Sequence, residues 1–215
     1  MITLVLADDH DLVRVGIRRL LEEVADFKVI GEASSGEEAV TRVRELSPDV
    51  VLLDANMPGI GGLEATKRML RYVPDVKVIV LSAYIEEPLP QKFLEVGARG
   101  YLTKGANIDE IENAVRKVKS GQIYLTPEVA QQMAIRSVQK ESSPFDKLSE
   151  RETQVMMMIT QGVKVTEISK LLCLSPKTVN SYRYRLFEKL GVNGDVELTH
   201  LAIRYGLIKA GMQQD

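Results

Sequence analysis

The sequence predicts an α/β protein in which a doubly wound (βα)5 domain with a parallel five-stranded sheet precedes a small all-α domain. The length of 215 residues suits two compact domains. Over the first 120 residues, short β-branched runs alternate with amphipathic stretches, and the strand starts recur about every 20 to 30 residues. This spacing is typical of βαβ units, whose right-handed crossovers place a parallel sheet between two layers of helices. After residue 148 the segments are short and helical.

Apolar runs that end in polar residues predict five buried strands, over 2–7, 28–33, 49–54, 77–82 and 99–104. Apolar residues at helical spacing predict the intervening helices, near 12–24, 36–46, 61–72, 87–96 and 108–120. In such a sheet, binding and catalytic groups lie at the carboxyl ends of the strands.

Residues 122–147 predict a connector with a short helix, because 137–147 are rich in Ser, charge and Pro. The predicted domains are therefore 1–121 and 148–215. In the second domain, helices are expected from Ser149 to Gly162 and over 166–172, 176–190 and about 195–206. The second and third of these, joined by a tight turn, predict a helix-turn-helix.

The composition excludes several classes of protein. With 45% hydrophobic and 27% charged residues, the chain is typical of an ordinary globular protein. The single cysteine, Cys173, cannot form an internal disulfide, and two histidines are too few for a His/Cys zinc cluster. The apolar stretch at the N-terminus is too short for a signal segment or a membrane span. We therefore expect a reducing, cytoplasmic setting and no membrane partner.

Charge is distributed unevenly along the chain. Residues 1–124 carry a net charge of −4, whereas residues 148–215 carry nine Lys and Arg against seven Asp and Glu. So small an excess is weak evidence for a polyanionic partner, because solvated faces of mixed charge are common.

Three carboxylates are expected to converge at one edge of the sheet. Asp8 and Asp9 follow the first strand and Asp54 ends the third, and these strands are expected to be neighbours. Like charges at short range are unfavourable, so a hard divalent cation, with Mg²⁺ the best candidate, is the natural compensation. The alternative is that each acid simply ends a strand or caps a helix.

Two further groups complete a site for phosphoryl transfer. Lys104 ends the fifth strand and supplies a mobile cation, and Ser82 ends the fourth and supplies a hydroxyl. In this arrangement the carboxylate of Asp54 is the nucleophile, while the metal neutralises the oxygens of the transferred phosphoryl group.

The motifs LADDH, LLDANMPGIGG, VIVLSAY and GARGYLTKG resemble the receiver domain of two-component response regulators, a flavodoxin-like fold, over residues 1 to about 120. The resemblance implies that Asp54 is the phosphoacceptor, that Asp8, Asp9 and the backbone carbonyl of Asn56 bind Mg²⁺, and that Lys104 forms a salt bridge to the phosphoryl group. Ser82 and Tyr101 match the positions that rearrange on phosphorylation. An aromatic residue at a strand end is, alternatively, a packing residue. Lys104 is followed by Gly105, where many receivers have Pro.

The helix over 176–190 carries groups that suit the major groove of DNA, with donors for phosphates and side chains that can read bases. These residues are Lys177, Thr178, Asn180, Ser181, Arg183, Tyr184, Arg185 and Lys189. The alternative is a solvated helix in a four-helix cluster.

The segments LSERETQV and TEISKLLCLSPKTVNSYRYRLFEKLGV resemble the effector domain of the NarL/FixJ, or LuxR-type, regulators, and they are most similar to the GacA/UvrY/LetA subgroup. By position, Asn180, Ser181 and Tyr184 are expected to face base edges and the other residues of that helix to lie on or near phosphates. One such domain contacts few base pairs, so a homodimer is implied. In the family the last helix commonly supplies the dimer contact, here Leu201, Ala202 and Tyr205; alternatively these residues only complete the core.

These observations predict a response regulator transcription factor that is not a turnover enzyme, although it is able to dephosphorylate itself. A sensor histidine kinase, by resemblance a hybrid kinase acting through a phosphotransfer domain, donates the phosphoryl group to Asp54, and the phosphorylated protein dimerises on promoter DNA. The alternatives are a constitutive DNA-binding regulator with a vestigial receiver and a phosphatase of the haloacid-dehalogenase kind. The latter usually shows Asp-x-Asp at one strand end, which DANMPG lacks. RNA binding is disfavoured because the second domain lacks an aromatic platform.

Overall fold

The structure is a computed structural model that describes residues 1–83, 89–139 and 143–208. The chain forms two compact units, one covering most of residues 1–131 and the other most of residues 132–208. Each unit has its own hydrophobic core, and each is described by itself.

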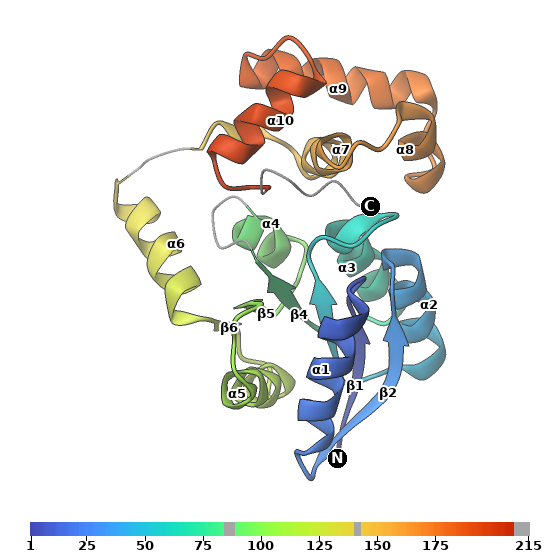
Figure 1. Cartoon of the computed structure of the whole chain (residues 1–215), viewed down its shortest axis with the longest axis vertical. Coiled ribbons are helices and arrows are strands. Elements are labelled where there is room, and N and C mark those ends of the chain that lie inside the picture. The colour runs from blue at the N-terminus through green and yellow to red at the C-terminus, as the bar shows by residue number, and fades with distance from the viewer. Residues whose placement is uncertain (84–88, 140–142, 209–215) are drawn as a thin grey trace. The chain divides into compact units, whose positions relative to one another are not determined.

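The first unit is built on a parallel sheet in the strand order β2-β1-β3-β4-β5-β6 (Figure 1). The strands are β1 (Ile2–Ala7), β2 (Phe27–Ala33), β3 (Val50–Asp54), β4 (Lys77–Ser82), β5 (Gly100–Thr103) and β6 (Tyr124–Leu125). As predicted, β1 and β3 are neighbours, with Leu4 opposite Val50 and Ala7 opposite Leu53. Their carboxyl ends therefore meet at the same edge of the sheet.

The prediction of five strands was wrong by one. The additional strand, β6, has two residues and pairs in parallel with β5, Gly100 opposite Tyr124 and Tyr101 opposite Leu125. A two-residue strand shows no periodicity in the sequence. It forms because the chain returns alongside β5, where the Tyr124 N–H bonds to the Arg99 carbonyl at 2.9 Å.

Five helices alternate with the first five strands along the chain. They are α1 (Asp11–Glu22), α2 (Gly36–Leu46), α3 (Gly61–Tyr72), α4 (Leu89–Glu95) and α5 (Ile108–Lys119). Alternate strand residues, such as Leu4 and Leu6 in β1, form a core with Ile111 and Val115 of α5. The helices α1 and α5 cover one face of the sheet, while α2 and α3 pack together on the other (Figure 1).

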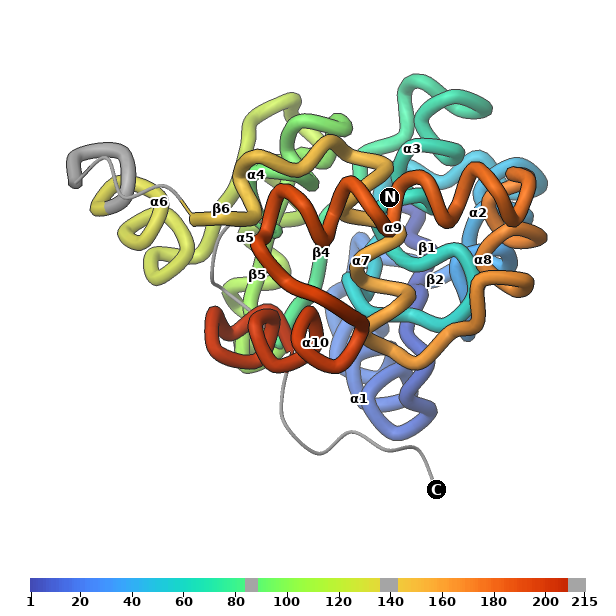
Figure 2. The backbone as a smooth tube through the Cα atoms, turned by 90° about the horizontal axis from the view of Figure 1, so that it is seen from above, coloured from blue at the N-terminus to red at the C-terminus, as the bar shows by residue number. Residues whose placement is uncertain are grey.

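After β6 the chain continues into α6 (Pro127–Gln139), and a single 3-10 turn, η1 (Pro144–Lys147), precedes the helices of the second unit. These are α7 (Glu150–Thr160), α8 (Val165–Leu171), α9 (Pro176–Leu190) and α10 (Asp195–Arg204). The chain passes from α8 through a short turn into α9 (Figure 2). In this turn Cys173 adopts a positive φ of 55°, which reverses the chain over a few residues.

Local sequence sets the ends of these helices. Ser149 and Glu152 form the expected capping box at the start of α7. Ser175 caps α9, where Pro176 is the first helical residue, and Gly191 ends that helix with a left-handed φ of 66°. The helix-turn-helix predicted from the sequence is therefore present.

Candidate functional site

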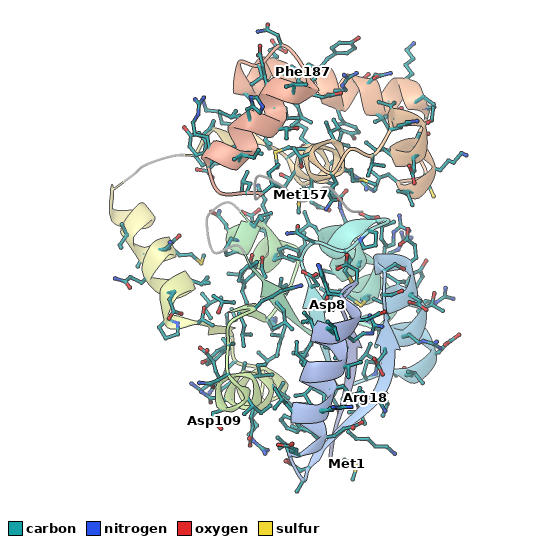
Figure 3. The ribbon with its side chains drawn as sticks, viewed as in Figure 1. Met1, Asp8, Arg18, Asp109, Met157 and Phe187 are labelled. Carbon is teal, nitrogen blue, oxygen red and sulfur yellow. The ribbon has the colours of Figure 1, made fainter. Side chains whose placement is uncertain are left out.

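The carboxyl ends of β1 and β3 bring Asp8, Asp9 and Asp54 together, as the sequence predicted. Asp8 lies at the end of β1 (Figure 3) and is fully buried, and Asp54 is 2% exposed. One carboxylate oxygen from each of these residues and a ring nitrogen of His10 all lie within 4.8 Å of one another. The sheet register thus concentrates three acids in a space of the size that a single cation would fill.

Lys104, in the loop after β5, reaches into this acidic cluster. Its Nζ donates a hydrogen bond to Asp54 Oδ2 at 2.7 Å and forms an ion pair with Asp8 Oδ2 at 2.9 Å. Burial alone would lower the pKa of Lys104, but the charges of Asp54 and Asp8 outweigh it and raise the pKa above its ordinary value. The ammonium group therefore stays charged and compensates two buried carboxylates.

Opposing interactions act on the pKa of the Asp54 carboxyl group. Burial raises its pKa to about 6, and the charge of Asp8 adds to the rise, although Lys104 and the Asn56 N–H favour the ionised form. The Asn56 N–H bonds to Asp54 Oδ1 at 3.0 Å. The negative charge of Asp54 is therefore unfavourable in this site. Replacing it by a group whose charge is better compensated would be favourable.

The donor set fits a hard divalent cation. Carboxylate oxygens are the preferred ligands of Mg²⁺. Asp9 Oδ1 is a buried atom that accepts no hydrogen bond from the residues that the structure describes. A buried carboxylate oxygen that accepts no hydrogen bond and lies beside two other acids favours a bound cation.

The loop from Asp54 to α3 is fastened from the neighbouring helix. Glu37 in the first turn of α2 accepts a hydrogen bond from the Ile60 N–H at 3.1 Å. Gly62 approaches the end of β3 so closely that a Cβ would lie 2.6 Å from the Asp54 carbonyl oxygen. Glu37 was not predicted as a loop contact, because it and Ile60 are far apart in the chain.

The two positions expected to rearrange are both buried. Ser82 ends β4 and Tyr101 lies in β5, and each side chain is 0% exposed. The Tyr101 ring packs against Phe93 of α4 with 6.0 Å between the ring centroids and an interplanar angle of 58°. In this conformation Tyr101 is a packing residue; its role as a switch stays a prediction.

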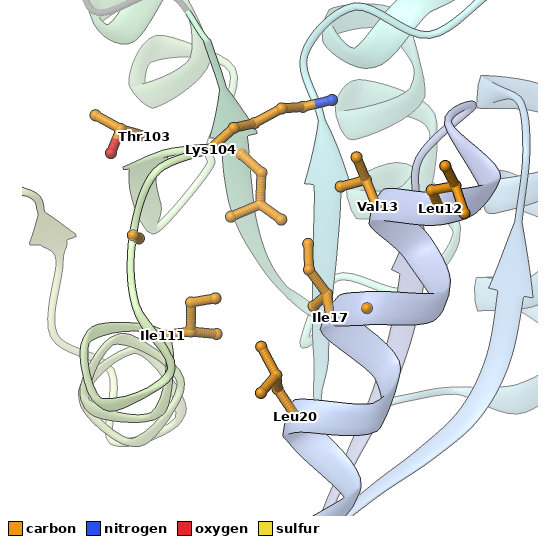
Figure 4. A pocket seen from close by; sticks show the side chains of 10 residues that line it. Leu12, Val13, Ile17, Leu20, Thr103, Lys104 and Ile111 are labelled. Atoms are coloured by element: carbon orange, nitrogen blue, oxygen red, sulfur yellow. The ribbon is translucent and has the colours of Figure 1, made fainter.

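A cavity of about 240 Å³ lies beside the acidic cluster, between α1 and the loop after β5 (Figure 4). The stem of Lys104 lines it, and from α1 the side chains of Leu12, Ile17 and Leu20 do so too. Leu12 is 90% exposed at its rim. The lining glycine of α1, Gly16, would place a Cβ in open space. The apolar lining of this cavity was not predicted from the sequence.

In the second unit, α9 presents one exposed polar face. The exposed residues of this face include Lys177, Ser181, Tyr184, Arg185 and Glu188, and Asn180 and Thr178 are half-buried at its sides. Tyr184 is 67% exposed. The opposite side of the helix packs into the core through Val179 and Leu186, both fully buried. The polar face is therefore the part of α9 that a ligand can reach.

Two of the predicted DNA contacts are engaged within the unit. Arg183 donates two hydrogen bonds to Asp195 at the start of α10, both at 2.7 Å. Lys189 bonds to Glu152 Oε2 at 2.6 Å and to the Lys147 carbonyl at 3.1 Å. Both side chains hold helices of this unit together.

The residues expected at a dimer contact lie on or just after α10. Ala202 is fully buried, Leu201 is half-buried and Tyr205 is 36% exposed. The Tyr205 ring meets Phe145 edge-on at 5.6 Å between centroids. The most exposed apolar side chain on this helix is Val196, at 69%.

Comparison with protein families finds two models that match this chain. Residues 4–116 match the response regulator receiver domain, and residues 146–202 match the bacterial regulatory proteins of the luxR family. Response regulator UvrY of Escherichia coli K12 is 58% identical over 98% of this chain and 97% of its own length. Response regulator GacA of Pseudomonas aeruginosa is 52% identical over 98% of this chain and 99% of its own length.

Solved structures of response regulators are also similar to this chain. RcsB from Salmonella enterica serovar Typhimurium, bound to the promoter rprA with the phosphomimetic BeF3−, is 26% identical and covers 93% of this chain and 97% of its own, with a TM-score of 0.76. A LuxR-family response regulator from Aurantimonas sp. SI85-9A1 is 33% identical and covers 64% of this chain and 99% of its own, with a TM-score of 0.62. Among the described residues, none of the helices is both long and apolar enough to span a membrane.

Proposed function

The chain belongs to the two-component response regulators with a LuxR-type DNA-binding domain, and from this premise we propose that phosphorylation of Asp54 controls its binding to promoter DNA. The observation that carries the proposal is the buried cluster in which Lys104 Nζ lies 2.7 Å from Asp54 Oδ2 and 2.9 Å from Asp8 Oδ2. A constitutive regulator has no need of this cluster, and the family of the chain does not favour a phosphatase.

The proposed reaction transfers a phosphoryl group from a phosphohistidine. A carboxylate oxygen of Asp54 forms the new O–P bond as the P–N bond of the donor breaks, and the donor imidazole, already protonated on its other ring nitrogen, leaves as a neutral ring. Lys104 would pair first with the free carboxylate of Asp54 and then with the oxygens of the phosphoryl group. The Asn56 N–H holds the other oxygen of Asp54, so the nucleophile does not rotate freely.

A divalent cation, Mg²⁺ by preference, would be held by Asp8, Asp9, Asp54 and the backbone carbonyl of Asn56. When bound, it would neutralise charge on the phosphoryl oxygens. Asp9 Oδ1, which is buried and accepts no hydrogen bond from the described residues, supports this assignment.

We place the phosphodonor over α1 because the apolar rim of the cavity borders the acidic cluster. Leu12 is 90% exposed there, next to the stem of Lys104. A helical phosphotransfer domain of a hybrid kinase would cover this surface and bring its phosphohistidine to Asp54. Leu12→Asp should then slow transfer from such a domain about tenfold or more, while phosphorylation by acetyl phosphate stays unchanged. Equal slowing with both donors would place the donor elsewhere.

For DNA, we propose that the exposed face of α9 enters the major groove. Asn180, Ser181 and Tyr184 are assigned to base edges, and Lys177, Arg185 and Thr178 to phosphates or their vicinity. Arg183 and Lys189 are assigned to positioning α9, because Asp195 and Glu152 bind them. A homodimer would present two such helices to paired half-sites. We assign its contact to the α10 surface around Leu201 and Tyr205, with the buried Ala202 behind it.

The proposal is tested by phosphoryl incorporation from acetyl phosphate, measured by intact mass alongside promoter binding, with and without Mg²⁺. Wild type is expected to gain one phosphoryl group only with Mg²⁺ and then to bind promoter DNA more tightly. Asp54→Asn, which keeps the shape of the site, is the control and should gain none. Equal promoter affinity of the phosphorylated and unphosphorylated forms would refute phosphorylation control and favour the constitutive regulator.

A further inference from the structure

The ring of His10 lies in the acidic cluster, although His10 also occupies the position that caps α1. His10 is the N-cap residue of α1, yet its side chain forms no capping hydrogen bond. Its Nδ1 lies 2.9 Å from Asp9 Oδ1 and 3.2 Å from Asp8 Oδ1. The imidazole is therefore turned from the end of the helix toward the two carboxylates.

These distances match neighbouring ligands on one ion. Octahedral cations bind ligand atoms at about 2.1 Å, which separates adjacent ligand atoms by about 3.0 Å. The nitrogen of His10 makes two such separations, one with each aspartate. The Asp54 carboxylate lies within the same 4.8 Å group.

A single ring N–H of His10 faces two carboxylate oxygens, at 2.9 Å and 3.2 Å. A neutral imidazole protonated at Nδ1 has only this one N–H there, and Asp8 Oδ1 meets the hydrogen-bond geometry. Asp9 Oδ1 is buried and accepts no hydrogen bond from the described part of the chain. It nevertheless lies closer to Nδ1 of His10 than Asp8 Oδ1 does. A hydrogen on Nδ1 can bridge the two carboxylate oxygens, and a cation in its place would take Nδ1 and both oxygens as ligands.

The geometry points to His10 as a nitrogen ligand, and we propose that it lets this site bind first-row transition ions such as Ni²⁺ more tightly than its oxygen ligands alone would. The inference rests on the proposed cation site and extends its ligand set. Imidazole nitrogen contributes little to the binding of Mg²⁺, which prefers oxygen, but it strongly favours Co²⁺, Ni²⁺ and Zn²⁺. The site would thus distinguish cations by one residue.

Calorimetric titration of the full chain with Ni²⁺ and, separately, with Mg²⁺ tests the proposal. His10→Ala should weaken Ni²⁺ binding about tenfold or more and change Mg²⁺ binding less than about twofold. The chain contains two histidines, so His200→Ala is a matched control for adventitious binding. His200 is exposed on α10, and its loss should leave both affinities at the acidic site unchanged.

A spectroscopic measurement identifies the ligand directly. Pulsed electron paramagnetic resonance of bound Cu²⁺ should show coupling to an imidazole nitrogen in wild type and in His200→Ala, and none in His10→Ala.

Three results would overturn the inference. Equal losses of Ni²⁺ and Mg²⁺ affinity in His10→Ala would make His10 a positioning residue for the carboxylates. Unchanged Ni²⁺ affinity would exclude it from the ligand set. If wild type bound neither ion, the cation site itself would fail, which is distinct from the loss of its nitrogen ligand.

Discussion

Arg183 of α9 holds Asp195 of α10 through two parallel hydrogen bonds, from Nε and from an Nη atom, each 2.7 Å long. Asp195 lies in the first turn of α10, where a carboxylate also compensates the partial positive charge of the helix end. The pair therefore fixes the angle between α9 and α10. A basic residue in a helix-turn-helix is in this case a structural residue.

Arg183→Ala is expected to lower the free energy of unfolding by about 1 kcal/mol, because the pair is bidentate but partly exposed. Urea denaturation measures this loss. In a double-mutant cycle with Asp195→Ala, the two losses should not add. Lys177→Ala is the matched control, since Lys177 is exposed on the same helix. Its stability should equal that of wild type. Additive losses would show that the pair contributes nothing to stability.

Residues on the polar face of α9 should affect DNA binding without affecting folding. Lys177→Ala is expected to weaken binding to all sequences about equally and to reduce the slope of log affinity against log salt by about 1. Asn180→Ala should instead lower the ratio of specific to nonspecific affinity, by about 1–3 kcal/mol in free energy. Fluorescence anisotropy with operator and scrambled duplexes over a series of salt concentrations measures both. A uniform loss for Asn180→Ala would assign it to the DNA backbone.

Sequence periodicity predicted the elements that carry a strong local signal. The bounds of α2 and α3 and the strands β1 and β4 agree with those expected, because each shows a clear apolar period, and Ser35 caps α2. The two-residue β6 carries no period, so its pairing with β5 could not be read from the sequence.

The site was predictable to the extent that strand ends define it. Asp8, Asp54 and Lys104 follow from the sheet order alone. The engagement of Lys189 by Glu152 depends on two residues 37 positions apart in the chain, which only the packed fold brings together. A signal for His10 was present in the sequence, since it directly follows Asp8 and Asp9, but adjacency does not reveal the direction of a side chain.

Lys104 pairs with two of the carboxylates, Asp8 and Asp54, that would bind a metal. Lys104→Met should therefore tighten Mg²⁺ binding about threefold or more, because two carboxylates lose their internal cation. Without metal the same variant should lose about 1–3 kcal/mol of stability, and saturating Mg²⁺ should restore most of it. Calorimetry and thermal denaturation measure the two effects. Weaker Mg²⁺ binding in Lys104→Met would show that Lys104 organises the site instead of competing for it.

Two glycines of the first unit should respond in opposite directions to alanine. Gly16→Ala is expected to stabilise by about 0.5–1 kcal/mol, because the added methyl group meets open space within α1. Gly62→Ala should destabilise by about 1–3 kcal/mol, because its Cβ would lie 2.6 Å from the Asp54 carbonyl oxygen. Chemical denaturation measures both. An equal response of the two variants would contradict the close approach of Gly62 to β3.

Asp54→Asn should stabilise the metal-free protein at neutral pH. Burial raises the pKa of Asp54 to about 6 from an ordinary value of 3.8, so the folded state binds the proton more tightly than the unfolded state does. The ionised carboxylate therefore costs stability fully above pH 6, and this cost declines as the pH falls from 6 toward 4. Since each pKa unit corresponds to about 1.4 kcal/mol, the variant should gain about 1–3 kcal/mol at pH 7.5.

Denaturant titrations in a chelating buffer at pH 7.5 and pH 4 measure this gain. The advantage of Asp54→Asn should be large at the higher pH and small at the lower one, where the wild-type carboxyl is protonated in the folded state and partly protonated in the unfolded state. Asp26→Asn is a suitable control: Arg116 lowers the pKa of the exposed Asp26, so this substitution should not stabilise the protein at pH 7.5. A pH-independent gain in Asp54→Asn would indicate a packing effect and would refute the electrostatic cost of the ionised Asp54 carboxylate.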